Sequence, residues 1–328
     1  MSSLLFLHEA LLSEFSLIQR YFTRATPSAV LGVGDDAALV QVGSGMELAI
    51  STDMLVSGTH FFADADPYLL GHKALAVNIS DMAAMGAQPR WATLAISLPS
   101  EDEAWLEQFS AGFFSLADEY KVELIGGDTT NGPLNLSITI MGEVPQGKAL
   151  RRDGAKVGDE IWVSGRLGDA ALALAHIQGK IKLSDASFNA TINALHRPVP
   201  RVALGLALRG IAHSAIDVSD GLLADLGHIL ERSHAAAAIQ FAKLPVSAHL
   251  SHYLAQPLVQ HCALAGGDDY ELCFTAPVAR HADLVKLSAQ LGLPLTCIGS
   301  IVTGSGCTLR AQDGSVMKIE EAGYEHFK

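Results

Sequence analysis

The segment from Tyr68 to Gly86 constrains the fold of this chain most strongly. It is predicted to be a helix that is apolar on nearly all sides, and such a helix is stable only when other parts of the fold cover it. Its one acid, Asp81, lies roughly 12 Å along the axis from the only other full charge, Lys73, at about 1.5 Å per residue. A carboxylate in this setting is costly unless it is paired or bound to a metal. We therefore expect Asp81 either to bind a metal ion or to pair with an arginine such as Arg90 or Arg152.

Strand-like and helical segments alternate along the rest of the chain. Strands are predicted at 47–52, 91–98, 122–125, 134–144, 160–164, 215–218, 236–241, 270–275, 295–302, 307–311 and 316–319, and helices at 101–121, 169–178, 222–233 and 278–291. A turn-rich stretch from 145 to 159 separates the two halves. The pattern predicts an α/β (α+β) protein of two domains, residues 1–148 and 149–328.

Composition excludes several classes of protein. The hydrophobic fraction of 49% excludes a disordered chain, and the net charge of −13 argues against nucleic-acid binding. No stretch of 18 uncharged apolar residues predicts a membrane span, and the N-terminus lacks the basic region of a signal peptide. The four cysteines contain no Cys-x-x-Cys pair and are predicted to be reduced thiols. We expect a cytoplasmic protein.

Many of the aspartates lie in apolar or glycine-rich segments. Several are predicted at or near the carboxyl ends of strands, where α/β sheets bind ligands: Asp53, Asp128, Asp217, Asp220 and Asp268. Asp36 lies in a further glycine-rich segment. Taken singly, each could be a turn or helix-cap residue. Together they exceed what 22 basic residues can neutralise while also keeping the surface soluble. Hard divalent cations such as Mg²⁺ prefer carboxylate oxygens, so we expect more than one such ion.

Metal ions beside glycine-rich turns indicate phosphate chemistry. The usual signatures of such chemistry are missing from this chain, including the P-loop, the full dinucleotide fingerprint and the protein-kinase motifs. Ser219 does not lie in a Gly-x-Ser-x-Gly nucleophile elbow. The sequence therefore predicts an ATP site of an unusual kind.

Six ordered motifs resemble the thiamine-monophosphate kinase family. They are GVGDDAA (32–38), STDMLVSGTHF (51–61), KALAVNISDMAAMGA (73–87), IGGDTT (125–130), AIDVSDGL (215–222) and GGDDYEL (266–272). The resemblance extends from about Glu14 to the C-terminus. Residues 1–13 lie outside it, and we interpret them as an extra helical turn or two.

The resemblance implies a fold similar to aminoimidazole ribonucleotide synthetase, with an N-terminal mixed sheet, a C-terminal α/β domain and a homodimer built through the N-terminal domains. It implies transfer of the γ-phosphate of ATP to thiamine monophosphate with the help of several Mg²⁺ ions. The implied Mg²⁺ ligands are Asp36, Ser51, Thr52, Asp53, Asp81, Asp128, Asp217 and Asp220. The implied ATP contacts are Gly127, Asp128, Arg152 and Ser219, and the implied contacts to thiamine monophosphate are His60, Asp268 and Tyr324. The family usually has Glu at position 268, so Asp269 or a water could replace the contact of Asp268.

This chemistry needs no catalytic base, because the second pKa of a phosphate monoester is near 6 and its oxygen is already a nucleophile at neutral pH. The obstacle is repulsion between two polyanions, about 4 kcal/mol for unit charges 4 Å apart at an effective dielectric near 20.

Three alternative functions remain. The first is a related synthetase of the same fold. A selenophosphate synthetase is one such enzyme, but it would need a cysteine near its N-terminus, and no cysteine precedes Cys262 in this chain. A di-metal phosphohydrolase usually has histidine ligands, and an acidic metal-binding protein does not bury its acids.

Overall fold

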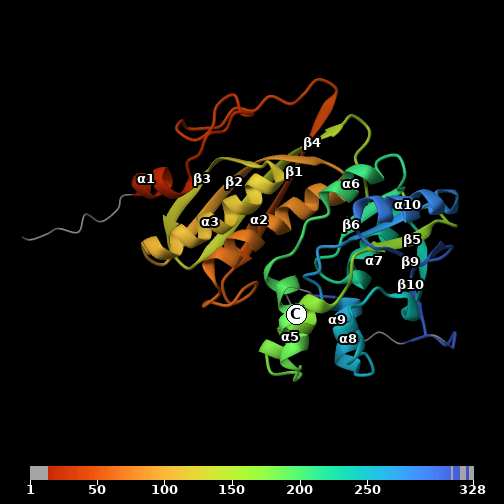
Figure 1. Ribbon diagram of the computed structural model, residues 1–328. Coiled ribbons are helices and arrows are strands. Elements are labelled where there is room, and N and C mark those ends of the chain that lie inside the picture. The colour runs from red at the N-terminus through yellow and green to blue at the C-terminus, as the bar shows by residue number, and fades with distance from the viewer. Residues whose placement is uncertain (1–13, 312, 318–322, 325–328) are drawn as a thin grey trace, which may run out of the picture.

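The computed structural model describes residues 14–311, 313–317, 323 and 324. The helical turn expected in residues 1–13 and part of the strand expected at 316–319 lie outside the described residues. Two β-sheets with helices packed against them form the described part of the chain (Figure 1). The α/β prediction is therefore confirmed.

The first sheet is mixed and has four strands. Their order across the sheet is β1 (Met46–Val56), β4 (Asn135–Pro145), β2 (Gln88–Leu98) and β3 (Glu123–Asn131). The β1–β4 and β4–β2 pairs are antiparallel, and the β2–β3 pair is parallel. Helices α2 (Pro67–Ala84) and α3 (Glu103–Tyr120) lie side by side along this sheet (Figure 1). On β4 the side chains alternate strictly between buried and half-buried, so the helices cover one face of the sheet.

Helix α2 is buried on all sides, as its sequence predicts. Asp66 caps its N-terminus by accepting a hydrogen bond from the backbone N–H of Leu69 (3.0 Å), and Pro67 occupies the first turn. Two glycines allow α2 and α3 to approach closely. A Cβ on Gly71 would lie 2.1 Å from a backbone oxygen of α3, and one on Gly112 would lie 1.9 Å from the Tyr68 carbonyl oxygen.

The second sheet has six strands. Their order is β10 (Gly306–Arg310), β7 (Ala236–Gln240), β9 (Leu295–Val302), β5 (Glu160–Ser164), β8 (Leu272–Ala276) and β6 (Ser214–Asp217). Only the β10–β7 pair is parallel. The helices of this half are α4 (Asp169–Ile177), α5 (Asp185–His196), α6 (Val202–Leu208), α7 (Leu222–Ser233), α8 (Ala248–Ser251), α9 (Pro257–Ala265) and α10 (His281–Leu291). Short helical turns complete the described elements: α1 (Glu14–Leu17), η1 (Ile18–Phe22), η2 (Phe241–Lys243) and η3 (Val278–Arg280).

Two predicted strand ends are wrong. Strand β1 continues past Asp53 to Val56, because β4 pairs with it along its full length. Strand β3 continues through Gly126 and Asp128, because β2 pairs with it as far as Asn131. Both aspartates therefore lie inside strands. Helices α5, α6, α8 and α9 were not predicted. The boundary between 1–148 and 149–328 stays a prediction; the first sheet ends at 145 and the second begins at 160.

One hydrophobic core extends across both halves of the described chain. Leu75 and Phe113 of the first half share it with Trp162 and Phe274 of the second sheet. Helix α2 contacts α6 and β6 as well as the first sheet and α3. The last turns of α2 therefore lie against the end of β6, which brings Asp81 toward Asp217.

Candidate functional site

The site begins where β1 meets α2. The Ser51 hydroxyl donates a hydrogen bond to Oδ2 of Asp81 (2.5 Å), and the backbone N–H of Asp53 donates to Oδ1 of Asn78 (3.2 Å). Asn78 in turn donates to the carbonyl of Ala74 one helical turn back (2.9 Å). Side chains on a strand alternate between faces, so Ser51 and Asp53 both face the helix. The carboxyl groups of β1 and α2 are thus held on the same side of the sheet.

The second half of the chain contributes Asp217 to the same place. Ser80 of α2 donates a hydrogen bond to Oδ2 of Asp217, the last residue of β6 (2.7 Å). Both side chains are buried, with Ser80 at 0% and Asp217 at 5% exposure. This bond joins the two halves of the molecule at the edge of the acidic cluster.

Charge repulsion within this cluster is visible in the pKa values. Burial, together with the charges of Asp81 and Asp220, raises the pKa of Asp53 to about 6. Burial and the charges of Asp81 and Asp53 raise the pKa of Asp217, although the hydrogen bond from Ser80 opposes the shift. Burial also raises the pKa of Asp81, and here the Ser51 hydroxyl and the charge of Arg152 act in the opposite direction. We name Asp53, Asp81, Asp217 and Asp220 the acidic cluster.

Arg152 is therefore the arginine whose charge acts on Asp81. Arg90, the other candidate, pairs instead with Glu143 of β4 (3.3 Å). Arg152 is exposed, and its carbonyl oxygen accepts a hydrogen bond from the Ser233 hydroxyl (2.8 Å).

The turn after β6 is fixed by a residue that sequence reasoning missed. Oδ2 of Asp225 accepts hydrogen bonds from the backbone N–H groups of Ser219, Asp220 and Gly221, at 3.0 to 3.1 Å. Burial and the charges of Asp217 and Asp220 raise the pKa of Asp225 to about 8. The one signal in the sequence was an acid in the first turn of a helix, which is a common place for a carboxylate that binds backbone N–H groups.

The segment 266–270 lies against this turn. The N–H of Asp268 donates to the Ser219 carbonyl (2.8 Å), and a Cβ on Gly267 (φ +70°) would lie 2.4 Å from that same oxygen. The Asp268 carboxylate accepts a hydrogen bond from Nζ of Lys73 (2.8 Å). Asp269, the alternative contact considered above, accepts from the Gly168 N–H (2.8 Å).

Other predicted site residues lie apart from the acidic cluster. Asp36 is exposed on the segment that precedes β1. Thr52 is exposed on the sheet face opposite Asp53, with its hydroxyl 2.8 Å from that of Thr139. Gly127 (φ +154°) lies on β3, which is three strands away from β1 in the sheet. It shares one row of paired residues with Asp53, and Ile138 of β4 and Leu94 of β2 lie between the two.

Asp128, which follows Gly127, is exposed, and by strand alternation its side chain lies on the face opposite Asp53. Asp36 and Asp128 therefore both lie on the surface, away from the acidic cluster. The two remaining contacts predicted for the acceptor lie near strand or turn ends. Nδ1 of His60 accepts a hydrogen bond from the Val56 N–H (3.0 Å). The N–H of Tyr324 donates to the Asp220 carbonyl (3.1 Å), which places that residue beside the turn after β6.

The acidic cluster is chemically suited to Mg²⁺. Within the described residues, no group of three or more His, Cys, Asp and Glu side chains already lies in metal-binding positions. The cluster nevertheless consists of carboxylates whose pKa values are raised partly by one another. Hard oxygen donors with uncompensated negative charge are what Mg²⁺ prefers, so the residues present fit such an ion.

Comparisons with known proteins give the family. Residues 34–144 match the family model of the AIR synthase related protein, N-terminal domain. A thiamine-monophosphate kinase of Escherichia coli K12 is 49% identical over 318 residues, which is 96% of this chain and 98% of that one. The chain belongs to the thiamine-monophosphate kinase family.

Solved structures agree with this assignment. The crystal structure of thiamine-monophosphate kinase from Stenotrophomonas maltophilia K279a is 50% identical, with a TM-score of 0.85 over 93% of this chain and 98% of that one. A structure of AaThiL complexed with AMPPCP and TMP is 33% identical, with a TM-score of 0.76 over 90% of this chain and 92% of that one. The predicted family and its fold are therefore confirmed.

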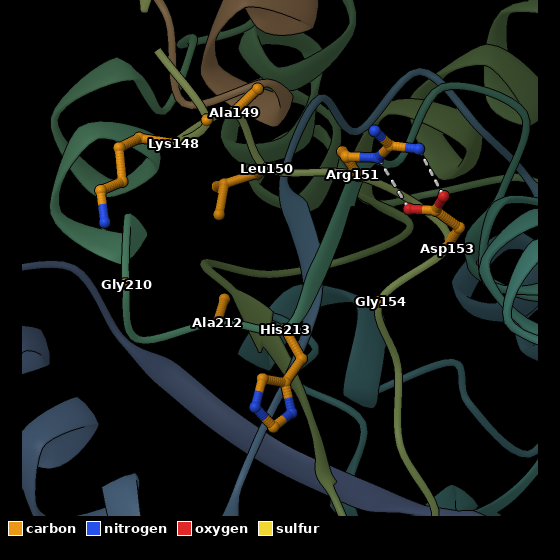
Figure 2. A pocket seen from close by; sticks show the side chains of 10 residues that line it. Lys148, Ala149, Leu150, Arg151, Asp153, Gly154, Gly210, Ala212 and His213 are labelled. Carbon is orange, nitrogen blue, oxygen red and sulfur yellow. Dashed lines mark hydrogen bonds and ion pairs between the residues drawn. The ribbon is translucent and has the colours of Figure 1, made fainter. Parts of the chain in front are cut away.

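A separate cavity of about 260 Å³ lies at the connection between the two sheets (Figure 2). Lys148, Arg151, Asp153 and His213 are among its lining residues. Arg151 and Asp153 are paired through two hydrogen bonds of 2.9 and 2.6 Å, as Figure 2 shows. His213 binds the buried Asp159 (2.8 Å). The charged side chains that line this cavity are thus largely paired with other residues of the fold.

No helix among the described residues is long and apolar enough to cross a membrane.

Proposed function

We propose that this protein transfers the γ-phosphoryl group of ATP directly to thiamine monophosphate, giving thiamine diphosphate and ADP. The observation that carries the proposal is the acidic cluster, in which β1, α2 and β6 bring carboxylates from both halves of the chain together. Membership of the family supports the choice of substrates, as does a relative that binds AMPPCP and TMP. We place the reaction in the cytoplasm.

The proposed roles follow the family motifs. Mg²⁺ ligands are proposed at Asp36, Ser51, Thr52, Asp53, Asp81, Asp128, Asp217 and Asp220. ATP contacts are proposed at Gly127, Asp128, Arg152 and Ser219, and contacts to thiamine monophosphate at His60, Asp268 and Tyr324. The Thr52 side chain itself faces away from the acidic cluster, on the sheet face opposite Asp53.

The chain's own residues arrange the reactants in this proposal. Ser51 and Ser80 each donate a hydrogen bond to a cluster carboxylate and fix where its oxygens lie. Arg152, whose charge already acts on the cluster, is placed to bind phosphate oxygens. Bound Mg²⁺ supplies positive charge that offsets the repulsion between the two phosphorylated substrates. The acceptor phosphate is itself the nucleophile, so no side chain has to remove a proton.

Exposed apolar side chains on the helix-free face of the first sheet support the proposed homodimer. Strands β1 and β3 are three strand spacings of about 4.8 Å apart, a distance of roughly 14 Å. Two oxygen ligands of one Mg²⁺ lie much closer together, because each is only about 2.1 Å from the ion. Asp53 and Asp128 of one chain therefore cannot share an ion. Ile50 (61% exposed) and Met54 (54% exposed) lie on the helix-free face of the sheet, as Asp128 does. We propose that a second copy packs on this face to form the homodimer.

An assay of ADP release tests the function. Purified protein with ATP and Mg²⁺ is given thiamine monophosphate, thiamine or no acceptor. ADP is expected only with thiamine monophosphate, and chelation of Mg²⁺ should abolish it. Equal ADP release without an acceptor would instead support a phosphohydrolase.

Sedimentation tests the proposed homodimer. The natural protein should sediment as a dimer, and Ile50→Lys, a change on the exposed helix-free face, should shift it to a monomer. A natural protein that sediments as a monomer would contradict the homodimer.

A further inference from the structure

The turn after β6, residues 219–221, has the arrangement from which proteins commonly build phosphate-binding loops. A buried strand leads through a short turn that contains a glycine into the N-terminus of a 12-residue helix. Successive backbone N–H groups in such a turn form a nest, a concave row of donors that binds anions, and the helix dipole strengthens this preference. Here the N–H groups of Ser219, Asp220 and Gly221 converge, because a single oxygen accepts hydrogen bonds from all three.

That oxygen belongs to the protein itself. Oδ2 of Asp225, in the first turn of α7, lies 3.0 to 3.1 Å from the three nitrogens. Asp225 is only 3% exposed. An internal carboxyl group thus occupies the position that a bound anion takes in a phosphate-binding loop. Within residues 219–221, every backbone donor is already used and none is left to reach a phosphate oxygen.

The carbonyl groups of the turn are fixed as well. The Ser219 carbonyl accepts a hydrogen bond from the N–H of Asp268 (2.8 Å), and the Asp220 carbonyl accepts one from the N–H of Tyr324 (3.1 Å). The third carbonyl of the turn accepts the N–H of Asp225 (3.0 Å). All backbone polar groups of the turn therefore have partners in the fold. The side chains of Ser219 and Asp220, both half-buried, remain to meet a ligand.

We propose that Asp225 is a positioning residue that fills the anion nest of the turn after β6, so that this turn meets a metal-bound nucleotide through the side chains of Ser219 and Asp220 only. The inference rests on the proposed function, in which these two residues contact ATP and Mg²⁺. A turn with free N–H groups attracts phosphate directly and competes with the metal ions for the phosphate oxygens. With the nest filled, the turn is held in one geometry before the nucleotide arrives.

Three variants of Asp225 separate the position of its oxygen from its charge. Asp225→Asn keeps an oxygen acceptor in the same place and loses the charge, Asp225→Glu keeps the charge and displaces the oxygen, and Asp225→Ala removes both. For Asp225→Ala and Asp225→Glu, kcat/KM for ATP should fall roughly 100-fold, the loss typical of a misplacement of about 1 Å. The Mg²⁺ concentration that gives half-maximal activity should rise in the same two variants, because Asp220 is displaced. Asp225→Asn should lose less than about fivefold, because its amide oxygen still accepts the three N–H groups.

Hydrogen exchange of the turn tests the filled nest without any measurement of activity. In Asp225→Ala the amides of residues 219–221 should exchange roughly tenfold faster than in the natural protein, as loss of a hydrogen bond predicts, whereas Asp225→Asn should keep them protected. Asp102→Ala is the matched control, because Asp102 also accepts a backbone N–H at the start of a helix, that of Trp105 in α3 (3.0 Å). It should lower stability and leave both the exchange of the turn and kcat/KM unchanged. Urea unfolding reports whether each variant is folded, and Asp225→Glu serves for both measurements if Asp225→Ala does not fold.

The possible outcomes are distinct. The inference is overturned if Asp225→Glu is more active than Asp225→Asn, because charge and not position would then decide activity. It is also overturned if residues 219–221 exchange no faster in Asp225→Ala than in Asp102→Ala. If the natural protein releases no ADP with thiamine monophosphate, the proposed function fails, while the exchange measurement still decides whether Asp225 fills the nest.

Discussion

The buried ion pair between Arg201 and Glu271 allows a quantitative test of how the start of α6 is held against the second sheet. Arg201 immediately precedes α6, which packs on α2, and Glu271 immediately precedes β8 of the second sheet. Nε and Nη2 of Arg201 lie 2.7 and 2.5 Å from the two carboxylate oxygens, and the Ser164 hydroxyl donates to the same carboxylate (2.5 Å). Side-chain exposure is 23% for Arg201 and 6% for Glu271.

Arg201→Met should lower the free energy of unfolding by about 3 kcal/mol. Removing one partner of a buried pair typically costs about 3–5 kcal/mol, because the other charge is left without compensation. The partial exposure of Arg201 places the expected value at the lower end. The measurement is urea unfolding followed by tryptophan fluorescence, with Trp162 on β5 as a reporter in the same sheet.

Two controls make this prediction refutable. Arg280 and Asp283 form an exposed pair (2.9 Å, 47% and 43% exposed), so Arg280→Met should cost less than about 1 kcal/mol. The double variant Arg201→Met with Glu271→Gln should recover part of the loss, because the amide carries no unpaired charge. The reasoning is refuted if Arg201→Met is as stable as Arg280→Met, or if the double variant is less stable than Arg201→Met.

Three further changes have definite expected results. Asp81→Asn should reduce ADP formation at least 100-fold, roughly the loss of about 3 kcal/mol of transition-state stabilisation, while urea unfolding stays cooperative; near-normal turnover would remove Asp81 from the proposed metal ligands. Gly127→Ala should weaken the β2–β3 pairing, because a Cβ there would lie 1.9 Å from the Leu94 carbonyl oxygen, and an unchanged unfolding midpoint would contradict this. Burial, reinforced by the charge of Arg197 and opposed by the Pro198 carbonyl, lowers the pKa of His72 below its ordinary 6.5. The unfolded chain then binds more protons, so the free energy of unfolding should fall as pH drops below about 6.5, and His72→Gln should reduce this dependence in urea unfolding at pH 5 to 7.

The long periodic elements were predictable from sequence, whereas the ends of paired strands were not. Helix α2 is evident from its apolar residues and its Asp66–Pro67 start, both of which are local features. Whether β1 stops at Asp53 or continues to Val56 depends on β4, which lies about 90 residues away in the chain. Helices such as α6 are short, and their burial depends on neighbours from the other half.

The acidic cluster was predictable in part, for a similar reason. Asp53, Asp81 and Asp217 stood out as acids in apolar segments, and they do come together. Asp128 stood out equally, but it lies on the opposite face, and strand alternation decides this only once the register is known.

Helix α2 touches the first sheet, α3, α6 and β6, and it also carries Lys73, Asn78, Ser80 and Asp81. Scarcely any position along it is open to solvent, so nearly every substitution there alters packing as well as chemistry. Laboratory selection for variants that accept a different phosphate ester should therefore enrich changes in the surrounding turns and leave this helix nearly invariant.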